Sequence, residues 1–176
     1  MLLSVALIPG LLLTLPPTDL AGKTVSLFPA SKPTVLIFVR TDCPISNRYA
    51  PELQRLYREY SPRVAFYLVY ADPAESAKDI QKHMSDYGYK FGALRDPSHE
   101  LVKLAKARVT PEAAVFSAHG ELLYHGRIDD LYVDFGKSKR EPTTHDLQDA
   151  VDAALAGKPV AVPETRAVGC YLADVQ

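Results

Sequence analysis

Two unbroken apolar runs predict the centre of a β-sheet. Thr34–Arg40 and Val64–Tyr70 are continuous stretches rich in β-branched and aromatic residues, a pattern typical of strands buried on both faces. Between them, behind Pro44, apolar residues recur at helical spacing: Tyr49, Leu53, Leu56, Tyr57 and Tyr60. This stripe predicts one amphipathic helix that ends at Pro62. Two strands joined by a helix imply a right-handed parallel crossover.

The rest of the pattern adds helices and a hairpin to this unit. It predicts a short strand at Thr24–Leu27, helices over Glu75–Tyr87, His99–Ala107 and Thr143–Leu155, and a hairpin of Ala113–Phe116 with Glu121–His125. Thr143 and Asp146 have the spacing of a capping box at the start of the last helix. Residues 127–142 are expected to form a polar loop. The sequence therefore predicts one α/β domain, a central mixed sheet flanked by helices, over residues 21–156.

Both ends of the chain lie outside this predicted domain. Residues 157–176 are expected to be an extended tail, and residues 1–20 contain the apolar run Leu2–Leu15. That run is too short for a membrane-spanning helix but has the length of a signal-peptide core. No Lys or Arg precedes it and no clear small-x-small site follows it. The alternative is a packed extension or strand beginning near Leu11. A signal peptide would mean a periplasmic or other extracytoplasmic protein; otherwise the protein is cytoplasmic.

Composition excludes several classes of protein. Twenty Lys and Arg face 21 Asp and Glu, so the basic excess of a nucleic-acid binder is missing. No second run approaches membrane-spanning length, so we expect no integral span in the mature chain. The sequence contains no GxGxxG, P-loop or HExxH motif, and we expect no cofactor. Two cysteines are enough for one redox pair.

Cys43 is the main candidate for chemistry. It directly follows a predicted buried strand, with Pro44 at the first helical position. Unpaired N–H groups and the helix dipole at such a site favour a thiolate. The Ser46 hydroxyl could donate a hydrogen bond to the sulfur, whereas the charge of Asp42 opposes the thiolate. The alternative is that Cys43 is a small buried apolar residue.

The chain resembles the thioredoxin superfamily. The resemblance rests on Cys43-Pro44-Ile45-Ser46 opening a helix after a strand, and on Val109-Thr110-Pro111 before the next strand. Within the superfamily it is most similar to the redoxin and peroxiredoxin-like group (alkyl hydroperoxide reductase/thiol-specific antioxidant), over roughly residues 24–155. The resemblance implies a thioredoxin-like three-layer sandwich. It also implies that Pro111 is a cis-proline which, with Thr110, faces Cys43 and shapes the groove for an extended thiol substrate.

Two departures from the family pattern leave the subtype open. Ser46 stands where thioredoxins have their second cysteine, so a dithiol within this motif is impossible. Peroxiredoxins have Thr or Ser three residues before their reactive cysteine; here Arg40 stands there, and Thr41 comes one position later. Disulfide reduction and peroxide reduction both stay open.

Cys170 is the second cysteine, and it lies in the expected tail. The resemblance to peroxiredoxins with a C-terminal partner cysteine implies that Cys170 resolves a sulfenic acid or mixed disulfide on Cys43. Resolution could occur within one chain or between subunits, and the oligomeric state is open. Gly169 would let the backbone approach closely. The alternative is a free thiol or an unrelated metal ligand.

A group of polar residues follows the predicted hairpin. Arg127 could face the active site and stabilise the thiolate, or be a surface arginine paired with Asp129 or Asp130. The loose set of histidines and aspartates here fits no metal-ligand spacing and predicts a solvated polar loop; it comprises His125, Asp129, Asp130, Asp134 and His145.

These observations predict a thiol-dependent oxidoreductase in which the Cys43 thiolate attacks a disulfide or a peroxide. The expected partners are a thiol or disulfide protein, or a peroxide, together with an external thiol reductant. The alternative is a non-catalytic thioredoxin-fold binding or copper-handling module. Copper transfer on this fold normally uses Cys-x-x-x-Cys, and Asn47 occupies the second cysteine position.

Overall fold

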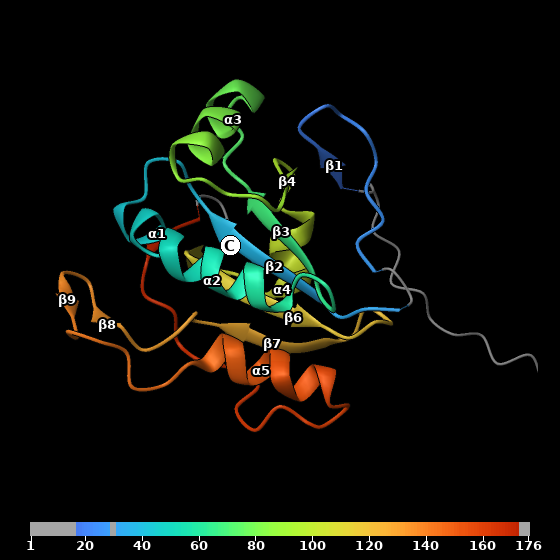
Figure 1. Ribbon diagram of the computed structural model, residues 1–176. Helices are drawn as coiled ribbons and strands as arrows, with labels where there is room; N and C mark the ends of the chain where they lie inside the picture. Colours follow the sequence, from blue (N-terminus) through green and yellow to red (C-terminus); the bar gives the residue numbers. More distant parts are fainter. Residues whose placement is uncertain (1–16, 29–30, 173–176) are drawn as a thin grey trace, which may run out of the picture.

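The computed structural model describes residues 17–28 and 31–172 of the chain. At its centre is a six-stranded mixed sheet with the order β1-β4-β3-β2-β6-β7 (Figure 1). Its strands are β1 (Thr18–Asp19), β2 (Thr34–Val39), β3 (Ala65–Tyr70), β4 (Gly92–Arg95), β6 (Glu112–Phe116) and β7 (Leu122–Gly126). Two small sheets pair β5 (Val109–Thr110) with β10 (Cys170–Tyr171) and β8 (Tyr132–Asp134) with β9 (Lys137–Ser138). The helices are α1 (Pro44–Arg48), α2 (Ala50–Tyr60), α3 (Ala77–Asp86), α4 (Glu100–Ala105) and α5 (Asp146–Leu155).

Strand β2 is the centre of the sheet, as the apolar pattern predicts. Every residue of β2 is buried. It pairs in parallel with β3, Ile37 opposite Leu68, and antiparallel with β6, Ile37 opposite Ala113. The predicted parallel pair and the antiparallel hairpin of β6 and β7 are therefore confirmed.

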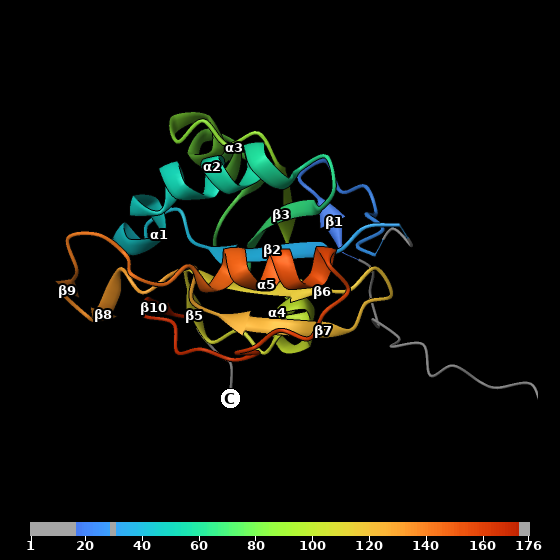
Figure 2. The ribbon, with the colours of Figure 1, turned by 60° about the horizontal axis from the view of Figure 1, so that its bottom comes forward.

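The two faces of the sheet are covered by different helices (Figures 1 and 2). Side chains alternate along β2: Ile37 belongs to the core cluster that includes residues of α1, α2, α3 and α5, whereas Phe38 belongs to the cluster with α4. The same alternation occurs on β3, where Leu68 and Val69 lie in opposite clusters. The result is the predicted three-layer α/β architecture, with Leu172 of the tail packed into the α4 layer.

The helix predicted from Pro44 to Pro62 is two helices, not one. Helix α1 ends at Arg48 and α2 begins at Ala50, with Tyr49 as the shared boundary residue. Pro51 explains the break, because its ring nitrogen cannot donate the hydrogen bond that a continuous helix requires. The predicted apolar stripe nevertheless faces the core, since Leu53 is fully buried.

Several short elements differ from the sequence predictions. Residues 24–27 do not form a strand; within them Thr24 makes an isolated bridge to Thr18. Strands β4 and β5 were not predicted, and β8 and β9 lie inside the segment predicted to be a loop. These strands have two to four residues each, too few to show a period of two.

The capping box predicted for the last helix is absent. Helix α5 begins at Asp146, and its N-cap residue His145 makes no side-chain cap bond. The Thr143 hydroxyl donates instead to Asp130, because the chain is still extended at that point. A capping box is present instead at the start of helix α3, between Ser76 and Asp79.

The apolar run Leu2–Leu15 lies outside the described residues. Strand β1 pairs antiparallel with β4, Thr18 opposite Arg95, so the sheet begins before the boundary expected at residue 21. Within residues 17–28 and 31–172, none of the helices has both the length and the apolar character needed to cross a bilayer.

Candidate active site

Cys43 lies in the connection between strand β2 and helix α1. It is the N-cap residue of α1, in extended conformation, and Pro44 follows at the first helical position. Its carbonyl oxygen accepts the first helical bond, from Asn47 N–H at 3.0 Å. The sequence-predicted position is thus correct, but the side chain is only 1 % exposed.

The structure brings Cys170 onto Cys43. The two sulfur atoms are 2.7 Å apart, and both residues are free thiols. Strand β10 pairs antiparallel with β5, Cys170 opposite Thr110, and the Thr110–Pro111 peptide bond is cis. Cys43 Sγ also lies 3.1 Å from the Thr110 carbonyl oxygen. Four residues singled out from the sequence therefore meet at one place.

The surroundings of the two sulfurs shift the pKa values of the two thiols in opposite directions. Burial raises the pKa of Cys43, but hydrogen bonds from the Cys170 thiol and from Ser46 outweigh it, so the pKa lies below its ordinary value. Burial and the interaction with Cys43 raise the pKa of Cys170 to about 12. Cys43 is therefore the more acidic of the two thiols, and Cys170 is the one that keeps its proton near neutral pH.

Ser46 contributes to the lowered pKa of Cys43. It is fully buried at the third position of α1, and its backbone N–H and its hydroxyl both favour the Cys43 thiolate. The hydroxyl has no partner of regular hydrogen-bond geometry among the described residues. The backbone N–H of Ser46 contributes more to lowering the pKa of Cys43 than the hydroxyl does.

Replacing Ser46 by alanine tests this contribution. Ser46→Ala removes the hydroxyl but keeps the backbone N–H, so we expect the pKa of Cys43 to rise. The ultraviolet absorbance of the thiolate, followed against pH, measures the change. The exposed helix residue Ser85, changed to alanine, is the matched control, and an unchanged titration in Ser46→Ala would refute the assignment.

A partly buried chain of hydrogen bonds holds the turn before Cys43. Thr41 N–H donates to Glu75 Oε1 at 2.6 Å, and Asn47 Nδ2 donates to the Thr41 carbonyl at 3.0 Å. Asn47 Oδ1 contacts His83 Nε2, whose other ring nitrogen contacts the Tyr70 hydroxyl, each at 2.8 Å. Thr41 thus acts through its backbone. Sequence reasoning missed Glu75 and His83, because partners more than 30 residues apart leave no local signal.

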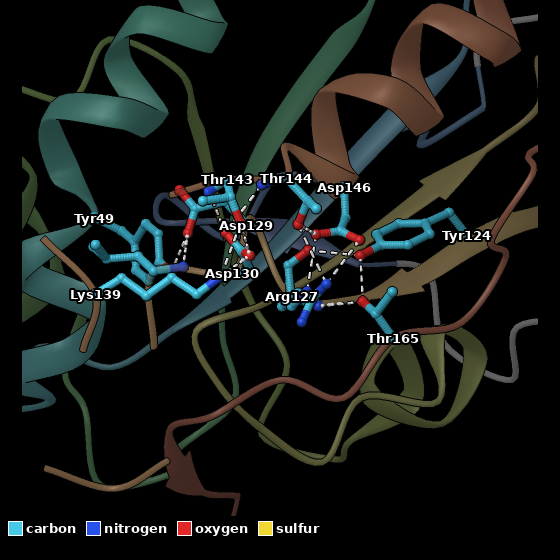
Figure 3. A network of polar contacts seen from close by, with 11 residues as sticks. Tyr49, Tyr124, Arg127, Asp129, Asp130, Lys139, Thr143, Thr144, Asp146 and Thr165 are labelled. Atoms are coloured by element: carbon cyan, nitrogen blue, oxygen red, sulfur yellow. Dashed lines mark hydrogen bonds and ion pairs between the residues drawn. The ribbon is translucent and has the colours of Figure 1, made fainter. Parts of the chain in front are cut away.

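Arg127 does not have the predicted role. Its guanidinium makes a bidentate contact with Asp146 at the start of α5, at 2.8 and 3.2 Å, and donates to Thr144 Oγ1 at 3.3 Å (Figure 3). The alternative prediction, an ion pair of Arg127 with Asp129 or Asp130, is also wrong, because its partner is Asp146. A carboxylate that accepts two hydrogen bonds matches the planar guanidinium well. Arg127 therefore holds the start of α5 and does not contact the Cys43 sulfur in the described structure.

Three residues of the polar set near Arg127 are buried, which contradicts the predicted solvated loop for them: His125, Asp129 and Asp130. Asp129 and Asp130 are 4 % and 6 % exposed. Asp129 Oδ1 accepts from the Tyr49 hydroxyl at 2.6 Å (Figure 3). His125 is also buried, whereas Asp134 and His145 are exposed as expected. Among residues 17–28 and 31–172, no three His, Cys, Asp or Glu side chains are grouped so that they could hold a metal ion.

Solved structures of other proteins share this fold. An uncharacterised conserved protein from Geobacillus kaustophilus is 28 % identical, with a TM-score of 0.76, covering 89 % of this chain and 87 % of that one. A secreted disulfide oxidoreductase from Mycobacterium tuberculosis is 21 % identical with a TM-score of 0.55, covering 81 % and 95 %. The latter likeness concerns the fold, which is thioredoxin-like.

One curated relative and one family model match part of the chain. The thiol-disulfide oxidoreductase ResA of Halalkalibacterium halodurans is 26 % identical over 106 residues, which are 60 % of this chain and 60 % of that protein. The match thus spans less than two thirds of that relative. The model of the AhpC/TSA family matches residues 10–125. Because this model matches more than half of the chain, the chain belongs to the AhpC/TSA family, and its fold is thioredoxin-like.

Proposed function

We propose that the protein is a thiol-disulfide oxidoreductase in which Cys43 is the nucleophile and Cys170 its resolving partner. The observation that carries the proposal is the 2.7 Å approach of the two sulfurs beside the cis Thr110–Pro111 bond. The charge distribution supports it, since the buried Cys43 is the more acidic thiol. Thiolate character is what thiol-disulfide exchange requires of the attacking sulfur.

The proposed reaction has two exchange steps. The Cys43 thiolate attacks one sulfur of a disulfide RSSR, forms a mixed disulfide and releases one RS⁻. Cys170 then loses its proton to solvent and attacks Cys43 Sγ, which forms the Cys43–Cys170 disulfide and releases the second RS⁻. The dithiol gives up two electrons and RSSR becomes two thiols. An external thiol reductant reverses both steps.

The surroundings of Arg40 favour a disulfide over a peroxide as the substrate. Arg40 stands where peroxiredoxins have a hydroxyl residue, and its guanidinium is paired with Asp42 at 3.1 Å and Asp72 at 3.3 Å. Both partners reduce the positive potential available to a bound peroxide. Asn47, at the position that a copper carrier fills with cysteine, has its amide bonded to Thr41 and His83, so metal handling is the weaker alternative.

Export of the protein belongs to the same proposal. The apolar run Leu2–Leu15 has the length of a signal-peptide core, and the related disulfide oxidoreductase from Mycobacterium tuberculosis is described as secreted. Disulfide chemistry is common in extracytoplasmic compartments. The partners would then be thiol or disulfide proteins outside the cytoplasm.

Peptide mapping of the oxidised chain tests the proposed pair. After treatment of the reduced protein with oxidised glutathione, we expect one linked pair of peptides containing Cys43 and Cys170, lighter by two hydrogens than the free peptides. Cys170→Ser should instead accumulate glutathione on Cys43, because nothing in the chain resolves it. A wild-type protein that carries glutathione on both cysteines and never forms the linked pair would refute the proposal.

A further inference from the structure

The C-terminal strand β10 lies in the groove beside the cis-proline. Cys170 pairs with Thr110 and Tyr171 with Val109, in antiparallel register (β10 and β5 are adjacent in Figure 2). Thr110 Oγ1 also donates to the Cys170 carbonyl at 3.4 Å. The chain's own tail therefore supplies this edge with an extended strand that carries a cysteine opposite Thr110.

Gly169 makes this close docking possible. A Cβ atom built on Gly169 would lie 2.2 Å from the Thr110 carbonyl oxygen and 2.6 Å from its carbon. Gly169 is not among the glycines with left-handed backbone, so alanine would suit its conformation. The need for glycine arises from the approach to Thr110 and from nothing within the tail itself.

The tail is attached to the domain on both sides of β10 and lines a cavity there. Thr165 N–H donates to the His125 carbonyl at 3.2 Å, and Leu172, 7 % exposed, packs into the α4 layer. Between these anchors the tail lines a cavity of about 690 Å³, whose other wall includes Arg108 and Glu112. Val168 and Cys170 are only partly buried against the core there, and β10 contributes two paired residues. A local opening of this end therefore breaks only these contacts and those of Leu172.

Neither sulfur offers an accessible thiolate while β10 is docked. Cys43 is 1 % exposed beneath the tail. Cys170 is partly exposed, but its raised pKa, about 12, keeps it protonated near neutral pH. The more acidic thiol, Cys43, is therefore buried, and the partly exposed thiol, Cys170, is the weaker acid.

We propose that β10 is an internal occupant of the groove, and that the reduced chain reacts with an extended, disulfide-bearing protein segment only after β10 leaves the edge of β5. This inference rests on the proposed function of Cys43. The Cys43–Cys170 disulfide would fasten β10 in the groove covalently, whereas in the reduced chain, with both thiols free, non-covalent contacts alone hold β10 against β5. The oxidised chain is therefore closed to protein substrates, whereas the reduced chain opens by detachment of the tail.

Gly169→Ala in the full-length reduced chain tests the inference. The probes are iodoacetamide and a synthetic cysteine peptide activated as its mixed disulfide with nitrothiobenzoate. Because alanine cannot approach Thr110, β10 should detach, and Cys43 should react about tenfold faster or more with both probes. Leu172→Ala, which weakens one anchor without a clash, should accelerate both reactions in the same direction.

Tyr171→Ala is the matched control, since that side chain is 80 % exposed and its loss leaves the backbone pairing intact. It should react at the wild-type rate. Circular dichroism checks that each variant is folded. If the folded Gly169→Ala and Leu172→Ala chains both react at the wild-type rate, the tail does not restrict access and the inference is wrong. If Cys43 is unreactive in every chain, the proposed function itself fails.

Discussion

Cys43→Ser is expected to reduce disulfide exchange on the order of 10²-fold or more, because it removes the proposed nucleophile, the more acidic of the two thiols. Cys170 remains, but burial still raises its pKa above that of free cysteine. A protonated thiol is a poor nucleophile at neutral pH. Release of nitrothiobenzoate from its symmetric disulfide by the reduced chain measures the rate.

Cys170→Ser should behave differently, which makes it the informative comparison. Serine resembles cysteine in size, so β10 should stay docked and Cys43 should still form its first mixed disulfide. One equivalent of nitrothiobenzoate should appear, and the second, which resolution by Cys170 releases in the wild type, should be missing. Equal loss in both variants would mean that neither sulfur has the distinct role assigned here, and equal activity would remove both from the mechanism.

The part of this site that could be predicted from the sequence is local. The apolar run before Cys43 and Pro44 after it place the cysteine at a strand end and a helix start, and the structure has it there. Both features depend only on neighbouring residues. The resemblance added Thr110 and Pro111, whose place beside Cys43 follows from the antiparallel pairing of β2 and β6.

The part that could not be predicted depends on contacts between distant residues. Cys170 is 127 residues from Cys43, and nothing local shows that the tail returns to β5. Gly169 was noted for close approach, and the structure names the approached atom, the Thr110 carbonyl oxygen. The local composition likewise predicted that Asp130 is exposed to solvent, because a charged residue in a polar segment usually lies at the surface.

Asp130→Ala is expected to destabilise the fold by about 3 kcal/mol, because it leaves several donors without their acceptor. Asp130 accepts from Thr143 N–H at 2.6 Å, from Thr144 N–H at 3.0 Å and from the Thr143 hydroxyl at 2.6 Å, and it pairs with Lys139 (Figure 3). These bonds fix the chain that leads into α5. Urea unfolding measures the loss in the free energy of unfolding.

Asp130→Asn is the matched control, because asparagine has the size of aspartate but no charge. Comparing the stability of the two chains against pH isolates the contribution of the charge. Burial raises the pKa of Asp130, but Lys139 and the threonine donors outweigh it and hold the pKa below its ordinary value. A depressed pKa contributes stability above the unfolded-state value of about 4 and loses it as pH falls toward the folded-state value. The wild type should therefore lose stability below about pH 4 more steeply than Asp130→Asn, which carries no titrating group there. Parallel stability curves for the two chains in acid would show that the charge of Asp130 contributes nothing to the fold.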